Sequence, residues 1–131
     1  MPLERLNPEG MSTPLSYSHV VVAGGSRIVF VAGQVGMDGH GKLTGPGDLA
    51  AQARQAYRNV VAALAAVGAT PADIARLTTY VVDHSPELLP VILKARSEVL
   101  GDHLPASTLV GVKALARPEY LIEVEATAVL D

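Results

Sequence analysis

The 131-residue chain contains no cysteine, no tryptophan and a single phenylalanine. Without cysteine the protein has no disulfide framework and no thiolate nucleophile, so its stability must come from packing and from association between chains. A chain without disulfides suits a reducing compartment, and we expect a cytoplasmic location.

Excess charge of one sign is also missing. Ten lysines and arginines face thirteen aspartates and glutamates, which gives a net charge of -3, and the seven arginines are scattered along the chain. Sequence-independent nucleic-acid binding needs grouped cations to neutralise phosphates, and base stacking needs aromatic surface. Only Phe30 and four tyrosines supply such surface. We therefore expect no nucleic-acid partner.

The first eleven residues carry Glu4, Arg5 and Glu9 and include no apolar run. This pattern excludes a signal peptide and a membrane span there, so we expect no membrane partner and a mature chain that begins near Met1. A chain of this length with 49% hydrophobic residues can bury one core. We predict a single domain over residues 1–131.

The N-terminal half predicts a hairpin followed by a helix. Residues 15–22 and 27–34 are strand-like runs joined by a turn at residues 23–26. Residues 36–47 contain five glycines and one proline, which is typical of a loop. A helix is expected from Leu49, with apolar residues at helical spacing and Gly68 as its stop.

The C-terminal half predicts a short turn at residues 70–73, a strand over 76–83, a helix from Pro86 to Leu100, and strands over 108–113 and 121–130. The order β-β-α-β-α-β-β describes an α+β fold with two helices on one face of a sheet. The other face would mix valine and threonine with Glu123 and Glu125. A face of this kind favours burial between subunits, so we predict a homo-oligomer.

Five segments together resemble the Rid family, also called YjgF or reactive intermediate deaminases. They are Tyr17-Ser18-His19, residues 30–35, residues 51–56, Pro105-Ala106-Ser107 and residues 122–126. The resemblance implies a chorismate-mutase-like fold, a homotrimer around a central barrel, and small-molecule clefts between subunits. It also implies hydrolysis of enamines or imines, released by pyridoxal-phosphate enzymes, to a keto acid and ammonia, with no metal and no cofactor.

Ser107 stands where the family usually has an arginine that holds the substrate carboxylate. Loss of such a clamp in a secluded cleft costs roughly 2 to 5 kcal/mol of anion binding, or about 30-fold to several-thousand-fold in affinity. The sequence therefore predicts a substrate other than a typical 2-imino acid, unless Arg27, Lys113 or Arg117 replaces the missing cation. The asparagine of many relatives on the second helix is also absent, with Val91 near its position.

Other site residues are implied by the resemblance. Tyr17 aligns with a site tyrosine, Glu123 with the carboxylate that orients or activates the attacking water, and Gly33 with backbone that borders the cleft. From spacing alone, Glu123 reads as a solvated residue on the inner face of the trimer. The hydroxyls of Ser107 and Thr108 could bind a neutral carbonyl or amide, but no GxSxG sequence surrounds them and a serine hydrolase is not expected.

His19 follows Tyr17 by two residues and would lie on the same face of a strand. It is a candidate proton carrier or substrate-binding residue, although a lone histidine on a strand is more often structural. The four histidines have no HxH or HExxH spacing, so no metal site is predicted.

Two functions remain open. The first is a cofactor-independent hydrolase or deaminase that uses Glu123. The second is a non-catalytic metabolite-binding or partner-binding trimer that has lost the reaction with the arginine. The label endoribonuclease, attached to parts of the family, is a distant third because of the acidic charge balance.

Overall fold

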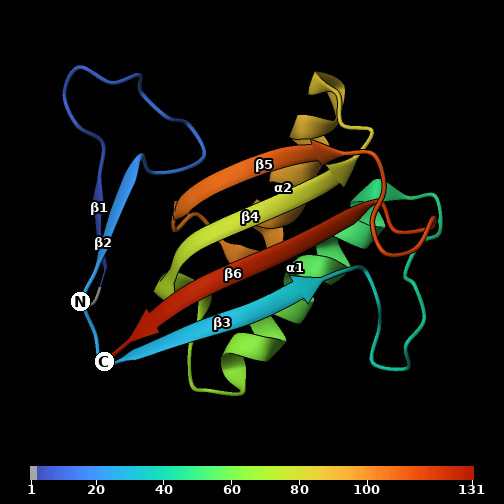
Figure 1. Ribbon diagram of the computed structural model, residues 1–131, viewed down its shortest axis with the longest axis horizontal. Coiled ribbons are helices and arrows are strands. Elements are labelled where there is room, and N and C mark those ends of the chain that lie inside the picture. Colours follow the sequence, from blue (N-terminus) through green and yellow to red (C-terminus); the bar gives the residue numbers. More distant parts are fainter. Residues whose placement is uncertain (1–2) are drawn as a thin grey trace.

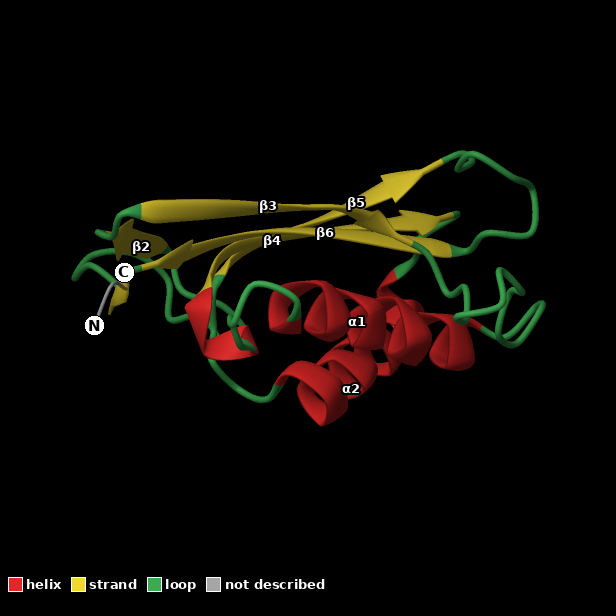
Figure 2. Ribbon diagram, turned by 90° about the horizontal axis from the view of Figure 1, so that it is seen from below, coloured by secondary structure: helices red, strands yellow, loops and turns green. Residues whose placement is uncertain are grey.

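The structure is a computed structural model that describes residues 3–131. Its main sheet has the strand order β3-β6-β4-β5, and both α-helices cover the same face (Figures 1 and 2). The strands are β3 (Arg27–Gln34), β4 (Ile74–Val82), β5 (Ala106–Val112) and β6 (Ile122–Leu130), and the helices are α1 (Leu49–Ala65) and α2 (Leu89–Leu100). The predicted α+β fold with two helices on one face is confirmed.

The connection from β4 through α2 to β5 makes the edge pair of the sheet parallel, whereas β6 pairs antiparallel with β3 and β4. A parallel pair needs a crossover, and α2 supplies it. Short 3₁₀ turns at Pro71–Asp73 and Pro86–Leu88 precede β4 and α2, and each begins with a proline, which is preorganised for a first helical position.

Helix α1 begins where the sequence predicts it. The Asp48 carboxylate accepts the backbone N–H of Ala51 at 3.1 Å and caps the first turn. The buried face of α1 packs on the alternating apolar positions of β6 to form the core. The fully buried residues on this face of α1 are Ala53, Ala56, Tyr57, Val60 and Leu64.

The predicted hairpin of residues 15–22 and 27–34 is wrong. Strand β2 covers only Val20–Ala23 and pairs with β1 (Leu3–Leu6), which the sequence reading missed, in a separate two-stranded sheet. A tight hairpin turn requires residues with positive φ, and neither Gly24 nor Gly25 has one. The chain therefore continues from β2 into β3 without reversing, and β1 and β2 lie apart from the main sheet (Figure 1).

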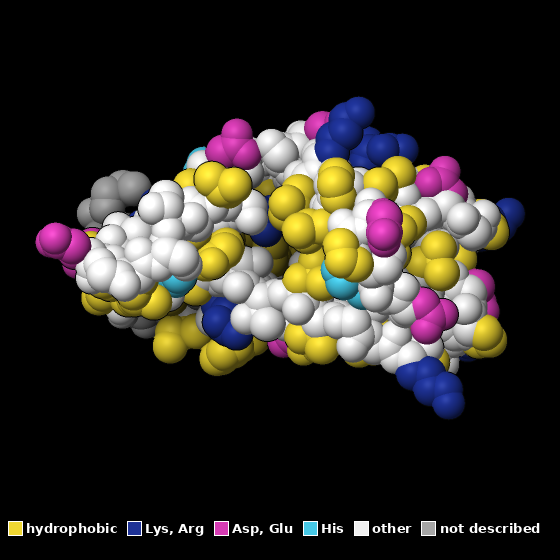
Figure 3. Space-filling model, turned by 90° about the horizontal axis from the view of Figure 1, so that it is seen from above, with side chains coloured by type: hydrophobic (Ala, Val, Ile, Leu, Met, Phe, Trp, Pro, Cys, Tyr) yellow, Lys and Arg dark blue, Asp and Glu magenta, His cyan; other side chains and the backbone are white. Residues whose placement is uncertain are grey.

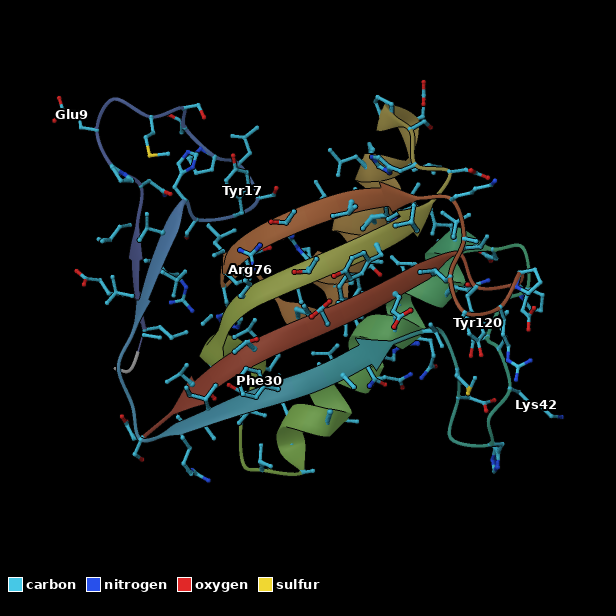
Figure 4. All side chains as sticks on the ribbon, in the orientation of Figure 1. Glu9, Tyr17, Phe30, Lys42, Arg76 and Tyr120 are labelled. Atoms are coloured by element: carbon cyan, nitrogen blue, oxygen red, sulfur yellow. The ribbon has the colours of Figure 1, made fainter. Side chains whose placement is uncertain are left out.

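The sheet face opposite the helices is open. Ile28 and Phe30 of β3 are 62% and 79% exposed on it, and Figure 4 shows Phe30 on that face. Within residues 3–131 no helix is long and apolar enough to cross a membrane.

Candidate functional site

A cavity of about 200 Å³ lies on the helix side of the edge strand β5. Figure 3 looks onto this edge and shows a hollow between the N-terminal part of the chain and the body of the molecule. The volume suits a small metabolite. The lining residues come from the N-terminal segment, both helices, β4 and β5: Ser16, Tyr17, Tyr57, Thr79, Leu89, Ile92, Leu93, Arg96, Ser107 and Leu109.

Ser16 and Tyr17 form one wall of the cavity because the next residue, Ser18, is hydrogen-bonded to the residues just before β5. The Ser18 hydroxyl donates to the carbonyl of Leu104 at 2.6 Å, and its backbone N–H donates to the carbonyl of Pro105 at 3.2 Å. Ser18 is buried as a result. Figure 4 shows Tyr17 on the segment that approaches β5. This docking, in place of the predicted strand, is what brings Tyr17 to the cavity.

Ser107 faces the cavity, whereas Thr108 faces the other side of the sheet. Ser107 pairs with the buried core residue Leu77 across the parallel ladder, and successive strand residues alternate faces. The Thr108 hydroxyl instead accepts a hydrogen bond from the Arg76 guanidinium at 2.9 Å on the open face. The two hydroxyls therefore do not act in one site within the chain.

A cation that sequence reasoning missed lies beside Ser107. The half-buried guanidinium of Arg96 on α2 donates through Nη2 to the carbonyl of Ser16 and through Nη1 to the Ser107 hydroxyl at 3.5 Å. Burial lowers the pKa of Arg96, but arginine remains charged at neutral pH. The earlier candidates do not line the cavity: Arg27 is exposed on β3, and Lys113 and Arg117 are exposed in the segment between β5 and β6.

A sequence signal for Arg96 did exist. Ile92, Arg96 and Leu100 follow one another at intervals of four, so they share one face of α2, and Ile92 and Leu100 are buried. A charged residue inside an apolar helical stripe is uncommon, because burying a charge costs free energy unless a partner compensates it. The position therefore indicated either a structural partner or a ligand.

Gly33 and Glu123 lie together, but on the open face of the sheet. Glu123 pairs with Tyr80 across the ladder, between the buried residues Ile122 and Val124. A Cβ atom placed on Gly33 would lie 2.0 Å from Oε2 of Glu123, so the carboxylate occupies the space that the glycine leaves free. Within one chain, the sheet thus separates Glu123 from the cavity that contains Tyr17 and Ser107.

His19 contacts Tyr17 from outside the cavity. The two rings meet edge to face with centroids 5.3 Å apart, and Nε2 of His19 lies 2.6 Å from the carbonyl of Ser12. Because a carbonyl only accepts hydrogen bonds, Nε2 carries the proton. His19 does not line the cavity, and its contacts order the N-terminal loop around Tyr17.

A second carboxylate on the open face, that of Glu125, shifts the pKa of Tyr80. Tyr80 donates a short hydrogen bond of 2.5 Å to Oε1 of Glu125. This bond raises the pKa of Tyr80, and desolvation and the charges of Glu125 and Glu123 add to the increase.

We expect Glu125→Gln to return the Tyr80 pKa towards the ordinary tyrosine value of about 10. Because the folded pKa is raised, the contribution of Tyr80 to stability is complete below pH 10 or so and is lost as the pH rises through the raised value. The phenolate absorbance during an alkaline titration measures the shift, and Tyr80→Phe identifies the step. Identical titrations of wild type and Glu125→Gln would contradict the assignment.

The sheet topology, with two helices on one face and a βαβ unit at its edge, defines a chorismate-mutase-like α+β protein. In residues 3–131, no three histidine or acidic side chains gather in a way that could hold a metal ion.

Comparison with known proteins identifies the family. The family model described as endoribonuclease L-PSP matches residues 10–130. A RutC family protein of Pyrococcus horikoshii is 32% identical over 112 residues, which cover 86% of this chain and 85% of that protein. A 2-iminobutanoate/2-iminopropanoate deaminase of Rattus norvegicus is 30% identical over 114 residues, covering 87% and 80%. A solved structure of a Rid-family protein from Yersinia pestis is 44% identical, with a TM-score of 0.93 and coverage of 99% and 100%. The chain belongs to the Rid (YjgF) family.

Proposed function

We propose that the protein is a cofactor-independent hydrolase that deaminates a small imine or enamine. Water adds to the imine carbon while Glu123 accepts a proton from that water. Glu123 then gives this proton to the nitrogen of the carbinolamine, the carbon–nitrogen bond breaks as the hydroxyl loses its proton, and ammonia leaves. One imine and one water thus give one carbonyl compound and one ammonia. An enamine enters the same sequence after protonation at carbon. The deaminase name of the rat relative supports this reaction type.

The observation that carries the proposal is a metabolite-sized cavity lined by Tyr17 and Ser107, two of the residues that the family pattern assigns to the site. Ser107 offers a hydroxyl at the usual arginine position. The typical arginine contact from β5 to a 2-imino acid is therefore not part of the proposal. The hydroxyl can bind the imine nitrogen or a carbonyl oxygen.

The proposal includes a homotrimer with its clefts between subunits. Glu123 and Gly33 lie on the open face of the sheet and the cavity lies on the helix face, so a complete site requires a second copy of the chain to bring its carboxylate to the cavity. The exposed side chains of Ile28 and Phe30 give the open face apolar area for such an association.

The alternative is a trimer that binds a metabolite without turnover, and it is favoured by the loss of the arginine at Ser107. The name of the family model raises ribonuclease activity as well, but a net charge of -3 without clustered cations disfavours binding to an RNA backbone.

Ammonia release from freshly generated imines tests the proposal. The purified wild-type protein is given 2-imino acids and neutral imines of similar size. We expect release above the spontaneous rate for at least one class. Acceleration of neither class, together with saturable binding of the corresponding ketones, would overturn the hydrolase and establish the binding alternative.

A further inference from the structure

We propose that Arg96 of α2 is the specificity-determining residue of the cavity and that the ligands it selects are small carboxylates. The inference rests on the proposed site, but it concerns binding and does not require turnover. It replaces the expectation, drawn from Ser107 alone, that the substrate lacks a carboxylate. A different residue, on a different element, would supply the guanidinium.

The Arg96 charge has no acidic partner in the fold. Among residues 3–131, the ion pair within 4.0 Å is that of Lys94 with Glu98, which are successive-turn neighbours on the outside of α2. The carboxylate whose charge bears on Arg96 is that of Asp102, which is exposed and bonded to Ser97. A half-buried guanidinium beside a cavity, with only neutral oxygen acceptors, retains an uncompensated positive charge that an anion would neutralise.

Arg96 also has donors to spare. A guanidinium carries five N–H groups, and the two contacts to the Ser16 carbonyl and the Ser107 hydroxyl occupy one on each Nη. Both contacts are to neutral groups, and the 3.5 Å bond to Ser107 is at the outer limit of hydrogen-bond length. A carboxylate in the cavity would take a bidentate, charge-assisted pair in preference to this long bond.

The small side chain of Ser107 is compatible with a carboxylate bound to Arg96. Arg96 lies within hydrogen-bond reach of the Ser107 hydroxyl, so an arginine at position 107 would bring two like charges together. The serine leaves room for the ligand, and its hydroxyl can donate to the same carboxylate. The pair Arg96 and Ser107 thus forms one anion-binding unit that spans α2 and β5.

A purely structural role for Arg96 is the competing explanation, because the bond to the Ser16 carbonyl fastens the N-terminal segment to α2. The two explanations differ in what they predict for ligand charge. Loss of a purely structural bond weakens binding of acids and of their neutral analogues alike, since both need the wall formed by Ser16 and Tyr17. Replacement of an anion-binding residue weakens chiefly the binding of the acid.

Isothermal titration calorimetry on the full chain decides between them, with 2-oxobutanoate as the acid and 2-oxobutanamide as the neutral probe. We expect wild type to bind the acid at least about 30-fold more tightly than the amide. Arg96→Gln should weaken acid binding by about 30-fold to several-thousand-fold and amide binding by no more than a few-fold. Arg58→Gln, an exposed arginine on α1 outside the cavity lining, is the matched control and should bind both probes as wild type does.

Equal affinity of wild type for acid and amide would overturn the inference without any variant. So would an Arg96→Gln protein that binds the acid as tightly as wild type, or one that loses both probes equally while its thermal melt is unchanged. If Arg96→Gln does not fold, Arg96→Lys is the alternative variant, because lysine retains the positive charge but cannot form the bidentate pair of a guanidinium. We then expect weakened acid binding with intact amide binding. Moving the guanidinium in Arg96→Gln/Ser107→Arg should restore acid binding.

The outcomes separate this inference from the proposed hydrolase. Acid binding that depends on Arg96, without ammonia release from any imine, sustains the inference and rejects the hydrolase. Turnover of neutral imines that is unchanged in Arg96→Gln, with no preference for the acid, sustains the hydrolase and rejects the inference.

Discussion

We expect Glu123→Gln to release ammonia from imines about 100- to 10,000-fold more slowly than wild type, because general-base catalysis contributes an effect of this size and an amide does not accept a proton from water at neutral pH. Glutamine has the same shape as glutamate, and Glu123 is half-buried on the open face of the sheet. The free energy of unfolding should therefore change by less than about 0.5 kcal/mol. Steady-state rates of ammonia release, measured beside a thermal melt, test this.

Glu125→Gln is the matched control. Glu125 lies two residues further along β6, on the same face, but its carboxylate accepts the Tyr80 hydroxyl and does not lie against Gly33. We expect its rate to stay within a few-fold of wild type. Equal losses of rate in the two variants would show that the reaction depends on the negative charge of the open face in general. A Glu123→Gln protein with the wild-type rate would show that Glu123 is not the general base.

Gly33→Ala should give the second large effect, a loss of roughly 100-fold in turnover with little change in stability. The added Cβ would lie 2.0 Å from Oε2 of Glu123 and 2.8 Å from its Cδ, so the carboxylate must move. The end of a glutamate side chain moves at little cost in folding free energy. A displacement of about 1 Å of a catalytic group, however, is enough to lower a rate by about two orders of magnitude.

Two other glycines provide the comparison. At Gly36 a Cβ would lie 2.7 Å from Cα of Gln52, a buried residue of α1, so Gly36→Ala must shift backbone and should destabilise the fold by about 1 to 3 kcal/mol. At Gly39 a Cβ would meet no atom within 4 Å, and Gly39→Ala should be neutral in both assays. Kinetics and chemical denaturation of the three variants separate the effects. A Gly33→Ala protein with wild-type turnover would show that the position of Glu123 is not critical.

Most of the secondary structure could be predicted from the sequence because local chemistry decided it. Asp48 caps α1, Pro71 and Pro86 open the short turns, and the alternation of residues 122–130 makes one face of β6 apolar. The prediction failed at the N-terminus. Gly24 and Gly25 are compatible with a hairpin, but their actual φ angles depend on where β2 docks, and β2 docks on β1.

The candidate site was harder to predict for a geometric reason. Tyr17 and Ser107 lie ninety positions apart and meet because Ser18 bonds to the residues before β5. Arg96 was overlooked although it lies only eleven residues before Ser107 and its place in an apolar stripe could have indicated it. Its nearness to the cavity depends on how the crossover docks α2 against β5, and sequence spacing does not determine that docking.

By itself, the sequence determined the α+β class, the two helices, the family resemblance and the absence of an arginine on β5. These features depend on local propensity, periodicity and residue identity. The tertiary structure alone decided which groups share a space: Arg96 joins Ser107 and Tyr17 on the helix side of the sheet, while Glu123 lies with Gly33 on the other side. The reason is that alternation along a strand fixes only which residues share its faces, whereas strand order and the docking of α2 and the N-terminal segment fix what those faces meet.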